Sequence, residues 1–182
     1  MSETIPVSTP RRQQIIATAR EILEEDGPSA LTMRAVADRL GIRAPSLYKH
    51  IPDKDALEHG LIEVAFDELG DAFEAARASQ TDLLVAMAQA YRRFGLEHPH
   101  LYRLMTEHKL DRSRIRPGAE ERAARLSIAS FGGSQDTARA LWAFAHGMVI
   151  LELNERFPAD AELDLAWQRG LAAFRTLMEK DT

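Results

Sequence analysis

The segment Leu31–Lys54 concentrates side chains that form hydrogen bonds and ion pairs. Its sequence is LTMRAVADRLGIRAPSLYKHIPDK, in which a serine, a tyrosine, a lysine and a histidine stand close together. Hydroxyl and cationic groups bind phosphate oxygens and the edges of nucleic-acid bases. From Gly27 to Lys54 there are five Lys or Arg against two Asp, a local net charge of +3 in a chain whose overall charge is −5. The segment therefore favours a polyanionic partner.

Two short helical patterns separated by a glycine turn must position these side chains. Thr32 is a predicted cap for a helix that Gly41 ends, and Pro45 opens a second helix that we expect to reach His50 or Ile51. The pattern is that of a helix-turn-helix, whose second helix suits the major groove of DNA. The predicted packing residues are Val36, Ala37, Leu40, Ile42, Leu47 and Ile51. The predicted DNA-contacting residues are Thr32, Arg34, Arg43, Ala44, Pro45, Ser46, Tyr48, Lys49, His50 and Lys54.

The rest of the chain also has helical periodicity, without an alternating strand pattern. We predict an all-α protein of about nine helices. The first three are expected from Pro10 to Gly27, Thr32 to Leu40 and Pro45 to Ile51. The others are expected over Lys54–Ala78, from Thr81–Asp82 to Pro99, and over Pro99–Glu107, Ala119–Ser130, Gln135–Glu155 and Asp160–Glu179.

Composition and missing motifs exclude several classes of protein. The chain has no cysteine, no apolar run of the roughly 18 residues that cross a bilayer and no signal-peptide core at its start. We therefore expect a cytoplasmic protein without a membrane partner. His98, His100 and His108 lie near Glu97 and Glu107, but the spacing across Pro99 does not place the first two on one helix face. We predict no metal, no cofactor and no catalytic residue.

Apolar and amphipathic residues in the second half of the chain permit two interpretations. They are either core residues or the walls of a pocket for a small molecule, with His146 as a polar group that orients a ligand or bonds across helices. The candidate ligand-binding residues are Met87, Tyr91, Phe94, Tyr102, Met105, Trp142 and His146.

The last two helices are the candidate dimer interface. The final helix carries an apolar stripe that we expect to be wider than a monomer buries, and each helix contains an interior glycine, either for close backbone approach or as a tolerated surface residue. The candidate interface residues are Gly147, Leu151, Leu163, Trp167, Gly170, Leu171, Phe174 and Met178.

The run LTMRAVADRLGIRAPSLYKHIPDKDAL resembles the DNA-binding signature of the tetracycline-repressor (TetR) family of bacterial regulators. One departure is Ile51, where an aromatic residue is common and where isoleucine should still fill the core. The segments YRRFGLEHPHLYRLM and LWAFAHGMVILEL resemble a C-terminal domain of one branch of this family, named for residues that would be Trp142, His146 and Gly147 here.

This resemblance implies a helix-turn-helix domain over residues 1–53 and a helical ligand-binding and dimerisation domain over residues 54–182. It implies a homodimeric regulator, most often a repressor, that binds palindromic double-stranded operator DNA and is released by a small-molecule effector. Two other hypotheses stay open: a helical hydrolase or metal enzyme using His98 and His100, and a protein-interaction module. DNA binding would weaken steeply with salt, whereas apolar docking of a protein would not.

Overall fold

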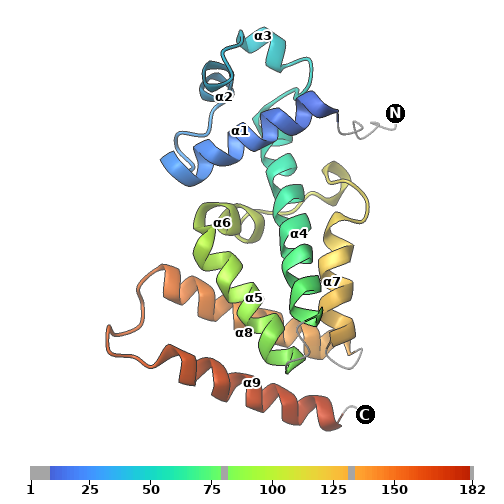
Figure 1. The fold of residues 1–182 in the computed structure, drawn as a ribbon, viewed down its shortest axis with the longest axis vertical. Helices are drawn as coiled ribbons and strands as arrows, with labels where there is room; N and C mark the ends of the chain where they lie inside the picture. The colour runs from blue at the N-terminus through green and yellow to red at the C-terminus, as the bar shows by residue number, and fades with distance from the viewer. Residues whose placement is uncertain (1–8, 79–81, 131–133, 181–182) are drawn as a thin grey trace. The chain divides into compact units, whose positions relative to one another are not determined.

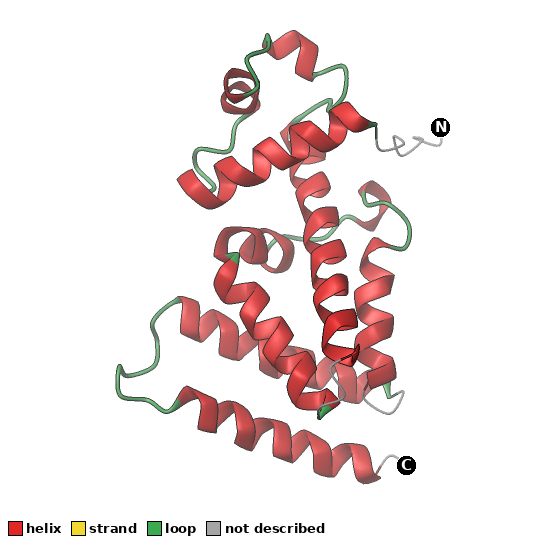
Figure 2. Cartoon of the chain, in the orientation of Figure 1, coloured by secondary structure: helices red, strands yellow, loops and turns green. Residues whose placement is uncertain are grey.

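The computed structural model describes residues 9–78, 82–130 and 134–180, and every regular element in these ranges is helical (Figures 1 and 2). The α-helices are α1 (Pro10–Asp26), α2 (Met33–Arg39), α3 (Ala44–Leu47), α4 (Lys54–Ala78), α5 (Leu83–Glu97), α6 (Pro99–Glu107), α7 (Ala119–Ser130), α8 (Gln135–Leu153) and α9 (Leu163–Lys180). A 3-10 turn, η1 (Arg112–Arg114), lies between α6 and α7. The predicted all-α class is confirmed; Thr81, part of one predicted helix start, lies outside the described residues.

Side-chain and glycine caps set several helix ends. The Thr9 hydroxyl accepts a hydrogen bond from the Arg12 N–H at 3.2 Å and so caps α1. At the other end Gly27 has a φ of +82°, and its N–H donates to the Leu23 carbonyl at 3.1 Å. Asp53 caps α4 by accepting from the Ala56 N–H at 2.7 Å. These caps satisfy backbone groups that a helix end would otherwise leave unpaired.

The chain forms two compact units, of which the first comprises residues 1–66 and 98–119. In this unit α1 packs against α2 and α6. Gly60 of α4 allows a close approach to α1, because a Cβ atom there would lie 2.4 Å from Cδ1 of the buried Ile16. The largest side chains of its core include Ile15, Ile22, Leu31, Leu47, Leu57, Leu61, Leu101 and Tyr102.

The second unit comprises residues 67–97 and 120–182, in which α5 packs against both α8 and α9. An ionic network with a buried glutamate at its centre joins these three helices. Arg92 donates to one oxygen of Glu152 from Nε at 2.9 Å and from Nη2 at 2.7 Å, and to Asp164 from Nη1 at 2.6 Å. The indole N–H of Trp167 donates to the other Glu152 oxygen at 2.7 Å. The carboxylate of Glu152 is thus fully partnered, as a buried charge requires.

Each unit is built from two segments that are not consecutive in the chain. The α4 helix contributes residues to both of them, and α6 with the connection to α7 belongs to the first unit although α5 belongs to the second. The boundary after residue 53 was implied by the family resemblance of the sequence, and it remains a prediction about which residues bind DNA and which bind a ligand.

Candidate functional site

The turn between α2 and α3 has the geometry of a glycine-terminated helix. Gly41 has a φ of +64°, and its N–H donates to the Asp38 carbonyl at 3.1 Å, while the Ile42 N–H reaches back to the Ala37 carbonyl at 3.0 Å. This pair of bonds closes α2 and turns the chain toward α3. No atom lies within 4 Å of a Cβ built at Gly41, so the backbone angle alone favours glycine there.

The packing residues hold the two helices together largely as expected. Val36, Ala37, Leu47 and Ile51 are each exposed by 1% or less, whereas Leu40 and Ile42 are half-buried. The expectation that isoleucine at position 51 would fill the core is confirmed.

The third helix is shorter than predicted. Only Ala44–Leu47 is α-helical, and a turn follows over residues 48–50, where the His50 and Ile51 N–H groups both donate to the Leu47 carbonyl. Pro52 disfavours the α-helical conformation only at Ile51, the residue before it, so it does not account for the turn conformation of residues 48–50. The prediction of a helix reaching His50 or Ile51 was therefore wrong in length, although Tyr48, Lys49 and His50 still continue the turn.

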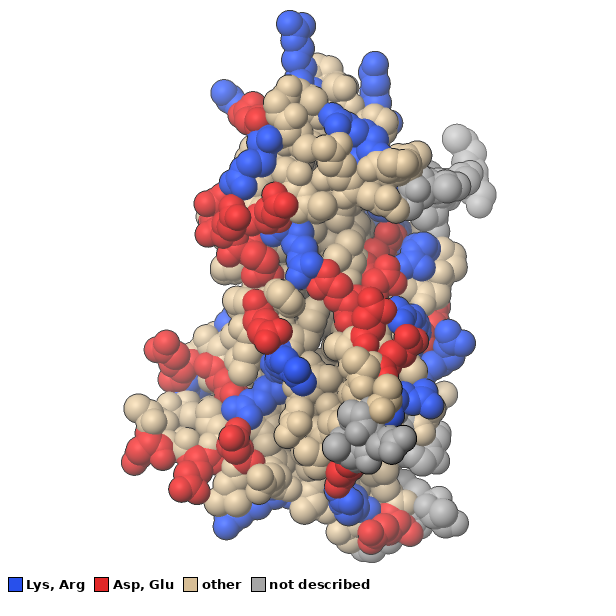
Figure 3. Space-filling view, viewed as in Figure 1, with Lys and Arg blue, Asp and Glu red and all other residues tan. Residues whose placement is uncertain are grey.

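All ten predicted DNA-contacting residues lie outside the core of the first unit. Ala44 and His50 are half-buried and the other eight are exposed, with Tyr48 exposed by 49%. Thr32 also caps α2, because its hydroxyl oxygen accepts from the Ala35 N–H at 3.0 Å. Its O–H remains a donor. Lys and Arg side chains project from the end of this unit that holds α2 and α3 (Figure 3).

The cations on this surface differ in their ion pairing. Arg34 lies 3.6 Å from Asp38, and Lys54 lies 3.4 Å from Glu58. Arg39 joins α2 to the end of α1 through Glu25 at 3.0 Å and Asp26 at 3.1 Å, and the hydrogen bond to Glu25 raises its pKa. Among the described residues, Arg43 and Lys49 have no ion-pair partner. These two are therefore the cations most available to an external anion.

The candidate ligand-binding residues divide between the two units. Tyr102 and Met105 of α6 are buried in the first unit. In the second unit Met87, Tyr91 and Phe94 are buried on α5, while Trp142 and His146 lie on α8.

The structure brings three of them together. The indole N–H of Trp142 donates to the hydroxyl of Tyr91 at 3.0 Å, and the Trp142 and His146 ring centroids are 6.2 Å apart. Trp142 is 55% exposed, so this cluster reaches the surface of its unit.

The candidate interface residues have different surroundings. On α9, Trp167 and Leu171 are buried within the chain, and Phe174 lies 5.7 Å, centroid to centroid, from Phe144 of α8. A Cβ atom at Gly170 would lie 2.2 Å from the ring of the same Phe144. The chain thus buries much of the stripe that we expected to need a second subunit. The half-buried residues are Gly147, Leu163, Gly170, Phe174 and Met178, while Leu151 is exposed by 40%.

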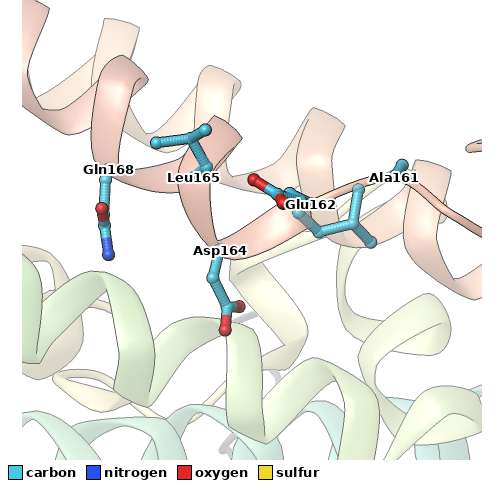
Figure 4. Close-up of a pocket in the computed structure, with 6 residues that line it drawn as sticks. Ala161, Glu162, Asp164, Leu165 and Gln168 are labelled. Atoms are coloured by element: carbon cyan, nitrogen blue, oxygen red, sulfur yellow. The ribbon is translucent and has the colours of Figure 1, made fainter.

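A hollow at the start of α9 lies apart from all these candidates except Leu163. It is open to solvent, and its labelled residues include Glu162, Asp164 and Gln168 (Figure 4). Asp164 already pairs with Arg92. Sites for small molecules are usually enclosed, so this open hollow does not have the form of an effector site.

Comparison with known protein families matches both parts of the chain. Residues 15–72 match the family described as "Bacterial regulatory proteins, tetR family", and residues 84–174 match "Tetracyclin repressor-like, C-terminal domain". An uncharacterized HTH-type transcriptional regulator of Mycobacterium tuberculosis, Rv0681, is 30% identical over 153 residues, which cover 79% of this chain and 70% of that protein. The chain belongs to the TetR family.

Solved structures share the fold of this TetR-family regulator. A protein of unknown function from Rhodococcus sp. RHA1 is similar with a TM-score of 0.77 at 24% identity, over 94% of this chain and 97% of that one. A TetR variant from Acinetobacter baumannii, solved in complex with minocycline, is similar with a TM-score of 0.63 at 25% identity, over 91% and 94% of the two chains.

Family membership decides between the classes of function considered from the sequence. The protein is a TetR-family transcriptional regulator and not an enzyme, so the hydrolase hypothesis based on His98 and His100 is set aside. Within the described ranges, no helix of this TetR-family regulator is long and apolar enough to cross a bilayer.

Proposed function

We propose that this protein is a ligand-responsive repressor that binds palindromic operator DNA as a homodimer in the cytoplasm and is released by a small-molecule effector. The observation that carries the proposal is the surface formed by α2, α3 and the turn after α3. It is exposed, and two of its cations, Arg43 and Lys49, have no ion-pair partner among the described residues. A cation without a carboxylate partner can bind a phosphate or a base without first breaking an ion pair.

The contacts divide by chemistry. Lys49 and Ser46 are proposed to contact base edges, because they follow the exposed start of α3. Thr32, Arg34, Tyr48 and Lys54 are proposed to hold phosphates on either side of the groove. Arg34 and Lys54 would exchange Asp38 and Glu58 for phosphate oxygens. Both are i, i+4 pairs in which every partner except Glu58, 27% exposed, is well exposed, so breaking them costs about 1 kcal/mol or less each.

The effector site is proposed at the cluster of Tyr91, Trp142 and His146 in the second unit. The cluster offers aromatic faces together with a phenol and an imidazole, which suits a ligand that is mostly apolar with a few polar atoms. A protein of this fold, the TetR variant from Acinetobacter baumannii, was solved in complex with minocycline, which supports a small-molecule site in this fold. Met87 and Phe94 of α5 would support the site, and Tyr102 and Met105 of α6 remain predicted contributors.

Release requires the effector to favour a conformation in which the two α3 helices are wrongly spaced for DNA. The α4 helix contributes to both units, which makes it the proposed lever. Because coupling is reciprocal, operator DNA must weaken effector binding by the same factor. Calorimetry on an effector found by screening, with and without operator, tests this. Equal affinities in the two experiments would rule out an inducing ligand.

A salt titration tests DNA binding itself. We expect the association constant for a fluorescent duplex to fall steeply between low and high salt, because phosphate contacts release counterions. Binding that responds weakly to salt would instead indicate an apolar contact and would favour the protein-interaction hypothesis.

A further inference from the structure

Carboxylates surround the end of α4 from which Lys54 is proposed to contact DNA. Asp53 caps the helix, Asp55 follows in its first turn, and Glu58 pairs with Lys54 at 3.4 Å. Carboxylates at a helix N-terminus stabilise the helix. Here the same charges would repel a phosphate that approaches Lys54. The carboxylates that stabilise α4 therefore oppose the proposed DNA contact.

A distant segment brings a cation to this place. Arg114, in the connection between α6 and α7, hydrogen-bonds through Nη1 to the Asp55 carboxylate, and the same nitrogen lies 3.9 Å from an oxygen of Asp53. All three residues belong to the first unit. One guanidinium therefore faces both carboxylates that flank Lys54 in the sequence.

The segment that carries Arg114 is fixed on both sides of it. Before it, the Asp111 carboxylate accepts from the Ser113 N–H at 3.0 Å, and this segment's hydrogen bonds lower the pKa of Asp111. After it, Ile115 is 4% exposed and the Arg116 N–H donates to Glu63 of α4 at 2.7 Å. These contacts dock the segment along α4.

We propose that Arg114 is a positioning residue for DNA binding, which neutralises Asp53 and Asp55 so that a phosphate can approach Lys54. This inference rests on the proposed function. Arg114 is not proposed to touch DNA, because its guanidinium is already committed to carboxylates. Arg114 acts through the local charge. Without its guanidinium, Lys54 would stand among the carboxylates of Asp53, Asp55 and Glu58.

The second half of α4 offers a matched control. Arg122 of α7 pairs with Asp71 and with Glu74, each at 2.7 Å, and its hydrogen bond to Glu74, followed by that to Asp71, raises its pKa. The arrangement is again one arginine from a distant segment facing two α4 carboxylates. These carboxylates lie in the second unit, about five turns of helix along the chain from Lys54 at about 3.6 residues per turn. A general loss of stability through α4 would therefore affect both arginine variants.

The test measures the affinity of the full-length protein for a fluorescent duplex that the wild-type protein has selected from a random-sequence pool. We expect Arg114→Gln to weaken binding by about fivefold at low salt, with a smaller difference at high salt because exposed charges are screened. Arg114→Lys should bind almost as the wild type does, because it keeps the charge. Arg122→Gln should leave the affinity unchanged.

Neutralising the carboxylates separates a charge effect from a contact. The Asp53→Asn/Asp55→Asn variant, in which asparagine can still cap α4, should bind the duplex at least as tightly as the wild type. Adding Arg114→Gln to this variant should lower its affinity only slightly. An equal loss in both backgrounds would overturn the proposal, since Arg114 would then contact DNA or support the fold. Wild-type affinity in Arg114→Gln would overturn it too. Failure of the wild-type protein to select or bind any duplex would instead refute the proposed function.

Discussion

Lys49 and Lys54 carry the same charge in different surroundings, and this difference predicts different roles. Lys49 is exposed at the turn after α3 and has no ion-pair partner within the described part of the chain, whereas Lys54 pairs with Glu58 at the start of α4. We therefore propose that Lys49 reaches the floor of a groove and that Lys54 contacts its phosphate wall.

Alanine substitutions should separate the two roles. Lys54→Ala should weaken binding to all duplexes alike and lower the slope of log K against log salt by about one, the loss of one phosphate contact. Lys49→Ala should instead relax sequence preference at one position in each half-site. Anisotropy titrations on a panel of single-position variants of the duplex measure both effects. An unchanged preference and affinity in Lys49→Ala would show that this region does not read the sequence.

Asp82 gives a residue-scale prediction about stability. The hydrogen bond from Arg175 of α9 holds the pKa of Asp82 below its ordinary value, and Asp82 also accepts from the Val85 N–H at the start of α5. A lowered carboxyl pKa contributes stability above the unfolded pKa of about 4, and that contribution is lost as the pH falls through the native value.

Asp82→Asn should therefore lower the thermal midpoint at neutral pH, and the gap from wild type should close below about pH 4. The effect should be small, because Asp82 is 39% exposed. Asp160→Asn is the control, an exposed acid with no ion pair among the described residues. A gap that stays constant down to the lowest accessible pH would show that the Arg175 interaction is not its source.

At the scale of elements, the sequence predicted those features that depend on neighbouring residues. Thr32 and Gly41 mark the ends of α2 in the sequence and in the structure because caps act within one turn. The prediction failed for the length of α3, which ends at Leu47. It also missed the network of Arg92 and Glu152, since residues 60 apart reveal no pairing through periodicity.

The packing of α9 on α8 gives a prediction at this scale. Alanine at Gly170 would gain up to about 1 kcal/mol in helix propensity, but its Cβ would lie 2.2 Å from the Phe144 ring. Overpacking costs about 1–3 kcal/mol, so we expect Gly170→Ala to lower the thermal midpoint. In a Phe144→Leu background, Gly170→Ala should lower the thermal midpoint by less. An equal drop in the thermal midpoint in both backgrounds would show that the effect of Gly170→Ala does not come from contact with Phe144.

At the scale of the whole molecule, the proposed dimer is the main prediction. Because Trp167 and Leu171 are buried within one chain, the stripe on α9 no longer requires a second subunit, and Phe174→Glu would disturb packing on Phe144 as well as any interface. Leu151 of α8 is a cleaner probe, since it is 40% exposed.

Leu151→Glu should therefore give the mass of one chain in light scattering at micromolar concentration, where the wild type should give two. Its helical content and cooperative unfolding should remain. Leu96→Glu, on the equally exposed Leu96 of α5, should stay dimeric. A Leu151→Glu protein with the mass of two chains and full DNA affinity would place the interface elsewhere.

From the sequence alone, candidate site residues could be grouped only where they lie close together in the chain. The DNA-contacting candidates fall within Thr32–Lys54 and share one unit, so local spacing was enough to group them. The ligand candidates come from α5, α6 and α8, and the structure brings Tyr91, Trp142 and His146 of this set together. Arg114 was visible as part of a basic segment, but its place beside Asp53 and Asp55 depends on the fold.

The most direct test of the account is the sequence that the wild-type protein selects from a pool of random duplexes. Two α3 regions related by a twofold axis should enrich an inverted repeat with half-sites about 34–36 Å apart, or one turn of DNA. The bound species should contain two chains for each duplex. Enrichment of a single unrepeated site bound by one chain, or of no sequence at all, would contradict the proposed homodimeric operator-binding regulator.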